Sequence, residues 1–394
     1  MEIRLLLLIS ILLFSATKQL DAKSVDVREL NAIEQITVQS QYIANGMKFN
    51  VTLPASYQSK PDKKYFVLLN FHPESQPYLA GLHYWLSHNG EWPWLETIIV
   101  TPAARNQNFT KLFETMNSPK GGSSLLNFLE KDLLATINKN FRTNNFTILN
   151  GFRGDGTLSL YVLFNRPELF NAYVISSPNL ANDYAKLMST AQVKLAKLND
   201  KPRFLFMSTG DHQYEQADLA DFTKLSKIIK NSAPKELTWK IKHFDDTYFM
   251  SQPIMAIVQG IEALFYDIHH DLQADSAISK QGAQAIVDHY TYLSQQKYGF
   301  DVSAQGSLIN LAKDTFKTSP NKTISILETT IKHYPNSTNA LHQLAETYFE
   351  LKQLDKAIIY QKYSLEKAKL QGDWYVKKQQ KYLTKYLSHL TSVN

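Results

Sequence analysis

The 394-residue chain contains no cysteine, which excludes disulfide bonds, thiolate metal sites and a cysteine nucleophile. It also lacks the HExxH pattern and any comparable histidine spacing, so we expect no metal and no cofactor. Beyond the N-terminus, no apolar window approaches the roughly 20 residues that a membrane-spanning helix requires. We therefore expect a mature chain without a membrane span, held together by its hydrophobic core.

The N-terminus has the pattern of a secretory signal. Arg4 precedes an apolar run from Leu5 to Ala16, and a cleavage site is plausible after Ala22. A buried core helix is the alternative interpretation. Because the run lies at the extreme N-terminus and is short for a membrane span, we predict a signal peptide over residues 1–22 and an exported protein, periplasmic or extracellular.

The formal net charge is +6, and neither a zinc finger nor an RNA-binding signature is present. We expect the positive charge to be spread along the chain, without a basic stripe. On this reading, nucleic acid is not a partner.

Residues 34–275 alternate between short apolar runs rich in β-branched residues and amphipathic stretches. This alternation predicts a mostly parallel sheet with helices on both faces, entered through an antiparallel pair of strands. The expected strands are 65–71, 97–102, 146–151, 172–177 and 203–209, and the expected helices include 123–141, 157–170 and 219–233.

The strands stop near residue 276. Residues 340–368 have small and apolar residues at helical spacing on either side of a short turn, which is the pattern of a tetratricopeptide repeat. A less regular repeat precedes it and ends at Pro335. We predict a hydrolase-like domain over 23–275 and a helical tetratricopeptide domain over 276–394, which packs on the first domain and binds a protein or peptide partner.

Several motifs together resemble the esterase branch of the α/β-hydrolases, which includes ferric-siderophore esterases and S-formylglutathione hydrolases. They are VTLPASY (51–57), GGSSLLNFLEKDLLATINKNFRT (121–143) and ILNGFRGDGTLSLY (148–161), followed by QGIEALFYD (259–267) and the linker VDHYTYLSQQKYGF (287–300). The resemblance extends to exported forms with a C-terminal tetratricopeptide region. It implies an α/β-hydrolase fold and an ancestral triad of serine, histidine and acid.

The nucleophile position departs from this family. The family elbow reads Gly-His-Ser-x-Gly-Gly, whereas this chain has Gly151-Phe152-Arg153-Gly154-Asp155-Gly156. The resemblance therefore places Arg153 where the serine belongs. A guanidinium carries no nucleophilic oxygen and cannot attack a carbonyl.

Two further positions depart from the family. Counting back from the glycine of the last hydrolase helix places Phe249 where the histidine belongs, and phenylalanine cannot relay a proton. After the first long strand the family has Leu-Asp-Gly, and a backbone amide there helps to bind the oxyanion. This chain has Phe71-His72-Pro73 instead, and proline has no N–H. Asp211 could occupy the acid position, but it has no histidine to orient.

Other residues could in principle carry chemistry. Asp155 does not match the spacing of hydrolases with an aspartate nucleophile, and we expect a first-turn carboxylate that interacts with the helix dipole and Arg153. Ser176 and Ser177 match a structural segment of the family. His72, His212 and His243 follow strands beside several aspartates, and we expect ordinary strand-end histidines rather than a metal site.

These observations predict a catalytically inactive esterase homologue that acts as a binding or scaffold protein, with Arg153, Asp211 and Phe249 as vestigial catalytic positions. Arg153 either fills the old pocket through an ion pair or, with His72, binds a small anionic ligand there. The alternative is an atypical hydrolase of esters or thioesters, acting without the serine.

Overall fold

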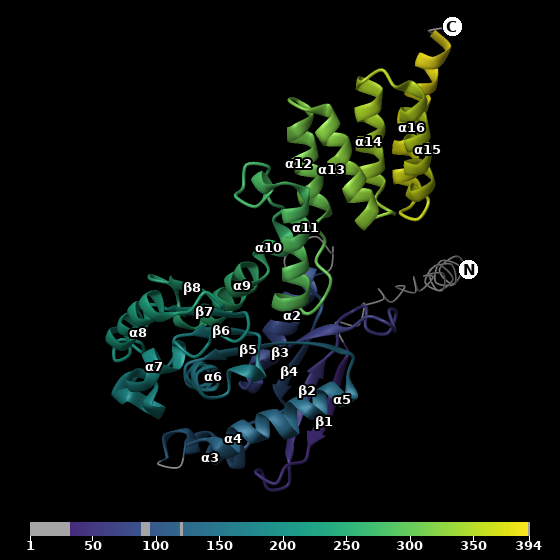
Figure 1. Cartoon of the computed structure of the whole chain (residues 1–394). Helices are drawn as coiled ribbons and strands as arrows, with labels where there is room; N and C mark the ends of the chain where they lie inside the picture. The colour runs from purple at the N-terminus through teal and green to yellow at the C-terminus, as the bar shows by residue number, and fades with distance from the viewer. Residues whose placement is uncertain (1–31, 88–94, 119–120, 393–394) are drawn as a thin grey trace, which may run out of the picture.

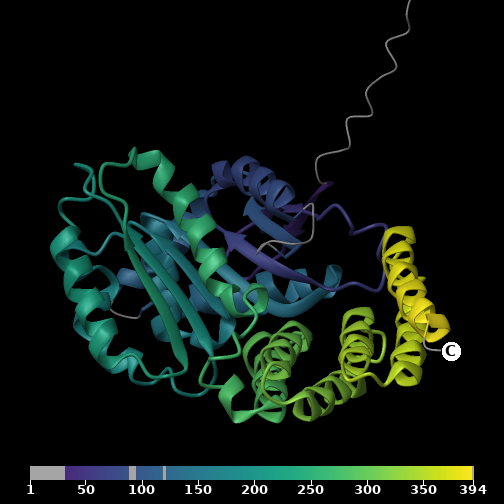
Figure 2. The same ribbon diagram turned by 90° about the horizontal axis from the view of Figure 1, so that it is seen from above.

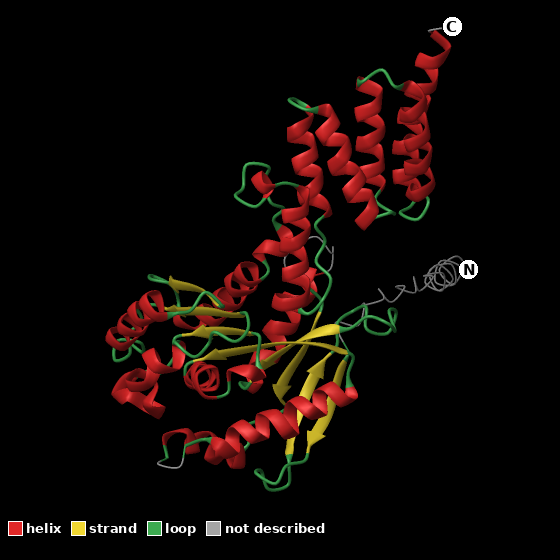
Figure 3. Cartoon of the chain, in the orientation of Figure 1, coloured by secondary structure: helices red, strands yellow, loops and turns green. Residues whose placement is uncertain are grey.

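The computed structural model describes residues 32–87, 95–118 and 121–392. The predicted signal peptide, residues 1–22, lies outside the described residues. Figure 1 shows an α/β unit from which a row of helices rises toward the C-terminus, and Figure 3 shows that this row is entirely helical.

The α/β unit contains an eight-stranded sheet with the order β1-β2-β4-β3-β5-β6-β7-β8. The first two strands are antiparallel to each other, and β2 is antiparallel to β4; the pairs from β4 to β8 are parallel. The strands are β1 (Ile33–Val38), β2 (Met47–Thr52), β3 (Tyr65–Asn70), β4 (Thr97–Pro102), β5 (Thr143–Phe152), β6 (Ala172–Ser176), β7 (Arg203–Thr209) and β8 (Leu237–His243).

The central strands follow the apolar runs because both of their faces are covered. Every residue of β3, β4, β6 and β7 is buried. Strand β8 was absent from the predicted set: its residues alternate between buried or half-buried and exposed, with Lys240 and Lys242 on the exposed side. An edge strand of this kind has no continuous apolar run, so the sequence pattern used for the buried strands does not predict it.

Helices cover both faces of the sheet. One face packs against α3 (Gln107–Glu114), the continuous helical stretch 123–140, α6 (Gly154–Asn165), α7 (Leu187–Leu195) and α8 (Leu219–Ser232). The other face packs against α2 (Gln76–Ser87), α9 (Gln252–Leu264) and α11 (Ala283–Tyr292). The short α10 (Tyr266–His269) leads out of the unit.

The C-terminal region consists of helices that stack in chain order. They are α12 (Gln305–Phe316), α13 (Pro320–His333), α14 (Thr338–Glu350), α15 (Leu354–Ala368) and α16 (Asp373–Ser392). Seen from above, they form a curved row beside the α/β unit (Figure 2). The fold class predicted from the sequence is thus confirmed: an α/β-hydrolase fold followed by a small all-helical region.

An aromatic cluster joins the helical region to the sheet. Phe300 contacts Phe66 of β3 edge to face, with ring centroids 4.8 Å apart, and the Tyr298 ring lies 5.8 Å from Phe146 of β5. The Tyr298 hydroxyl also donates to the carbonyl of Leu264 at the end of α9. The two parts therefore share one continuous core, as expected for a helical region that packs on the first domain.

The expectation that positive charge is spread along the chain is wrong. Residues 351–394 contain nine lysines, no arginine and three acidic residues, so this segment alone carries the whole formal excess of +6. The remainder of the chain is balanced. The excess lies on α15, α16 and the turns beside them.

Candidate functional site

The turn between β5 and α6 has the backbone of a nucleophile elbow. A Cβ at Gly151 would lie 2.2 Å from the carbonyl oxygen of Asp155, so any side chain there would clash with backbone. At Gly156, a Cβ would lie 3.2 Å from both Ile175 and the carbonyl oxygen of Ser176. These two glycines let the first turn of α6 approach β5 and β6 closely.

Arg153 occupies the tip of this turn with φ 53° and ψ −120°. A conformation with φ in this range is rare for a residue with a Cβ and costs on the order of 1–3 kcal/mol. Its backbone N–H donates to the carbonyl of Ser176 at 3.1 Å, which ties the tip to β6. The strained geometry of an elbow has therefore been retained with arginine at its tip.

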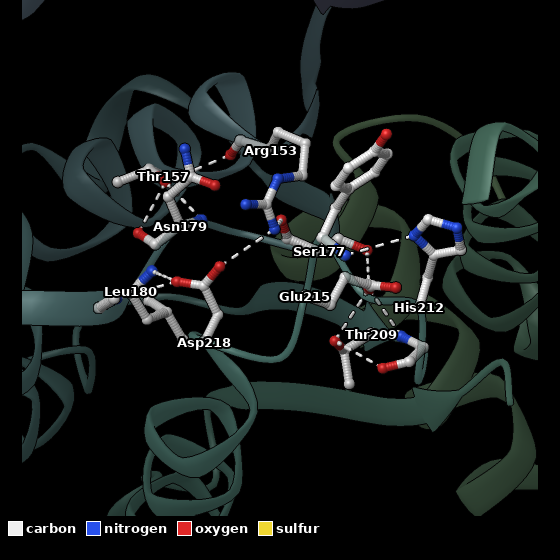
Figure 4. Close-up of polar contacts among 12 residues, drawn as sticks. Arg153, Thr157, Ser177, Asn179, Leu180, Thr209, His212, Glu215 and Asp218 are labelled. Atoms are coloured by element: carbon white, nitrogen blue, oxygen red, sulfur yellow. Dashed lines mark hydrogen bonds and ion pairs between the residues drawn. The ribbon is translucent and has the colours of Figure 1, made fainter.

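The Arg153 side chain pairs with Asp218, and not with Asp155 as one expectation had it. Its Nη1 lies 3.1 Å from Asp218 Oδ2 and donates to the carbonyl of Ser177 at 3.3 Å (Figure 4). The Asp218 side chain is only 6% exposed, and its other oxygen accepts hydrogen bonds from the backbone amides of Leu180 and Ala181. These three donor groups satisfy the buried carboxylate.

Phe249 lies next to the tip of the elbow. The Arg153 guanidinium carbon is 6.0 Å from the centroid of its ring, which also contacts Phe152, His212 and Tyr214 at 5.0–5.4 Å. The position that the family resemblance gives to the histidine therefore faces the position that it gives to the nucleophile. Phe249 is buried, and the ring packs in an aromatic cluster.

Asp211 is exposed and accepts a hydrogen bond from the backbone of Asp246. The buried acid in this loop is Glu215, which is fully buried and accepts from the Ser177 hydroxyl at 2.6 Å and the Gly210 amide at 2.8 Å. Gln252 donates to its other oxygen at 2.8 Å. Burial raises the Glu215 pKa, but the hydrogen bonds, with Ser177 first among them, outweigh burial and leave that pKa below its usual value.

A cleft of about 400 Å³ opens beside the ion pair. Its walls are Phe113, Arg153, Gly154, Thr157, Asn179, Ala181, Tyr184, Tyr214, Ala217 and Asp218. The Arg153 side chain remains 27% exposed here although it is paired. Both sequence interpretations of Arg153 thus find a geometric counterpart: an ion pair and an open cleft.

A second cleft of about 240 Å³ lies on the other side of Phe113 and contains His72 and Asp155 together with Arg105 and Pro73. Burial raises the Asp155 pKa to about 7, and the nearby Arg105 charge lowers it only in part. Burial and Arg105 lower the His72 pKa. The backbone amide of His72 donates to the side-chain oxygen of Asn70 at 2.8 Å, so this amide already has a hydrogen-bond partner at the end of β3.

The structure separates the two predicted binding residues, because Arg153 lines the larger cleft and His72 the smaller one. The sequence analysis missed Asp218, Glu215 and Gln252. Asp218 was visible as an acid immediately before α8, a common helix-start residue, but nothing in that position indicated a contact with Arg153. Glu215 and Gln252 meet only after folding.

Within residues 32–87, 95–118 and 121–392, no three His, Asp or Glu side chains gather in a group that could hold a metal ion. Across those same residues, no helix combines the length and apolar character needed to cross a membrane.

Solved structures share this architecture. An IroE-like serine hydrolase from Shewanella oneidensis is 22% identical; the match covers 77% of this chain and 100% of that one, with a TM-score of 0.57. An uncharacterised protein from Capnocytophaga ochracea is 14% identical, with a TM-score of 0.67 and coverage of 91% and 100%. The second match extends beyond the α/β unit, so it includes helical C-terminal residues. At these identities the likeness concerns the fold.

None of the curated proteins matches the chain significantly in sequence. The family model described as "Putative esterase" matches residues 40–237, which is half of the chain and spans β2, the elbow and the start of β8. The chain therefore belongs to the esterase family of the α/β-hydrolases.

Proposed function

We propose that this protein is an exported esterase-fold protein that does not catalyse ester hydrolysis and acts by binding a partner. The observation that carries this proposal is the side chain at the elbow tip: Arg153 takes the strained backbone position of a nucleophile but is paired with the buried Asp218. Phe249 faces it from the position of the base.

The cost of losing triad residues supports the proposal that the site is inactive. Removing serine or histidine from a working triad costs on the order of a millionfold in turnover, and further losses cost little more because the residues act as a unit. Replacement of both positions, together with Pro73 at the oxyanion region, is what relaxed selection on a lost activity would produce.

The helical region supplies the proposed partner site. We take α12 to α15 as two tetratricopeptide-type helix pairs, because each helix packs on the next in chain order. A cleft of about 240 Å³ between α12, α13 and α14 offers Lys313, Glu346 and Glu350 around an apolar floor that includes Phe316 and Leu327. A protein or peptide segment would bind along this row of helices.

The cleft beside Arg153 is the proposed site for a small anionic ligand. A guanidinium has five N–H donors, and the ion pair and the hydrogen bond described for the Arg153 side chain both use Nη1. The first turn of α6 adds backbone amides next to the exposed part of the side chain. Tyr184 and Tyr214 would contact the apolar body of such a ligand.

Turnover of p-nitrophenyl acetate and butyrate by the purified chain tests the proposal. We expect rates at the level of buffer alone. Rates well above that level that vanish on His72→Ala, Ser177→Ala or Asp155→Asn would overturn it.

A paired experiment asks whether the fold still supports the ancestral chemistry. We expect Arg153→Ser combined with Phe249→His to gain measurable esterase activity over an inert wild type, with each single variant as its control. A gain would support retirement of an otherwise intact scaffold.

The alternative function is an atypical ester or thioester hydrolase, and the second cleft favours it. Asp155, with a pKa of about 7, could act as a general base near neutral pH beside His72. This alternative predicts activity that is lost in Asp155→Asn and unaffected by Arg153→Ala.

A further inference from the structure

The turn between α15 and α16 presents apolar side chains to solvent. Leu370 is 74% exposed, Trp374 65% and Tyr375 43%. We call Leu370, Trp374 and Tyr375, together with Lys369, Lys377 and Lys378, the hairpin patch. Exposed leucine and tryptophan this close together are unusual on a surface that meets only water.

Contacts within the chain hold the patch in place. The Trp374 and Tyr375 rings meet edge to face with centroids 4.9 Å apart, and the Lys378 ammonium lies 5.3 Å from the Trp374 ring. The Thr338 hydroxyl donates to the Gln371 side chain at 2.8 Å, which attaches the turn to α14. The apolar side chains are therefore displayed by two anchored helices.

The charge of the surrounding surface is predominantly positive, although the exposed Asp373 lies within the turn and Glu366 near it. Residues 351–394 carry the whole excess positive charge of the protein, and all of their basic residues are lysines. Bidentate recognition of phosphate in nucleic acids favours arginine, which this segment lacks. Lysines around exposed tryptophan, tyrosine and leucine are the combination found where a protein lies on an anionic membrane surface.

We propose that the hairpin patch docks the protein on membranes that contain anionic lipids. Leu370 and Trp374 would enter the boundary between headgroups and acyl chains, while the lysines contact anionic headgroups. Figure 1 places α15 and α16 at the side of the helical row away from α3, α4 and α6, with the turn that joins them at the end of the row nearer the α/β unit.

Co-sedimentation of the mature chain, residues 23–394, with vesicles tests the proposal. We expect binding to phosphatidylglycerol–phosphatidylcholine vesicles and none to pure phosphatidylcholine vesicles. A lysine near an anionic surface contributes about 1 kcal/mol, so each one lost should weaken binding about fivefold. The variant Lys369→Glu/Lys377→Glu/Lys378→Glu should lose binding, and Leu370→Ser/Trp374→Ser should weaken it while salt dependence persists.

The matched control is Lys224→Glu/Lys227→Glu/Lys230→Glu, which makes the same charge change on exposed positions of α8. It should retain most of the binding, and circular dichroism should show that all variants are folded. Absence of wild-type binding to the anionic vesicles, or an equal loss in the α8 control, would overturn the proposal. Binding to DNA or polyglutamate without binding to vesicles would overturn it as well.

Discussion

The two clefts on either side of Phe113 treat buried charge in opposite ways. In the larger one, Asp218 is matched by Arg153 and two backbone amides, and Glu215 nearby is surrounded by donors. In the smaller one, Asp155 is desolvated, and only the partial influence of Arg105 lowers its pKa. The carboxylates on the first side are satisfied by an ion pair and hydrogen bonds, whereas the second side holds a carboxyl group with a raised pKa.

The contrast shows how a charged side chain is accommodated at the tip of an elbow. The elbow keeps its strained backbone because Gly151 and Gly156 are needed for α6 to pack on the sheet, whatever residue occupies the tip. A large cation at that tip then requires a counter-ion close by, and Asp218 supplies it. Within the described part of the chain, Asp155 has no such counter-ion, and burial instead favours its protonated, uncharged form.

The largest loss of stability is expected from Glu215→Ala, in the hydrogen-bond network near the Arg153 cleft. This change removes the buried acceptor of the Gly210 amide and of the Gln252 side-chain amide, and it leaves the Ser177 hydroxyl with the Gln252 oxygen as its remaining acceptor. We expect a loss of about 3–5 kcal/mol in the free energy of unfolding, measured by urea denaturation. The exposed neighbour Gln213→Ala is the control, and a similar cost at both positions would contradict the importance of the network.

A smaller effect is expected from Asp218→Asn. Asparagine keeps an acceptor for the amides of Leu180 and Ala181 but removes the charge opposite Arg153. We expect a loss of about 2 kcal/mol, reduced by the partial exposure of Arg153. In a double-mutant cycle with Arg153→Met, the coupling should account for most of that loss. Additive effects of the two changes would show that the ion pair contributes nothing.

The smallest effect is expected at Asp155, and it should depend on pH. The folded-state pKa of about 7 lies above the ordinary aspartate value of 3.8, so ionisation destabilises the folded state. Stability is undiminished below about pH 4 and falls as the pH rises toward 7. Asp155→Asn removes this penalty and should stabilise the protein by about 1–2 kcal/mol at pH 8, allowing for solvent in the cleft.

Melting temperatures of Asp155→Asn and wild type between pH 4 and pH 8 provide the measurement. The difference should grow with pH up to about 7 and then level off. The exposed Asp62→Asn serves as control and should show no such trend. A difference that is independent of pH would indicate that the Asp155 carboxyl is not desolvated in solution.

Much of the fold could be predicted because its signals are local. The β4 and β7 runs matched their strands residue for residue, since continuous apolar segments bounded by turn residues are buried on both faces. Strand β8 was missed because alternation at a sheet edge is a weaker signal. The same holds for the site. The elbow glycines and Arg153 lie in one short stretch of sequence and could be predicted from it, whereas the counter-ion of Arg153, Asp218, could not.

The sequence alone therefore determined the fold class, the elbow and the identity of the residues at the three altered positions, because each depends on neighbours along the chain. Only the tertiary structure decided that Arg153 pairs with Asp218 across 65 residues of chain, that Glu215 and not Asp211 is the buried acid, and that His72 lies in a different cleft. Electrostatic contacts depend on distance in space and on burial, and for residues far apart in the chain both are set by how the strands and helices pack.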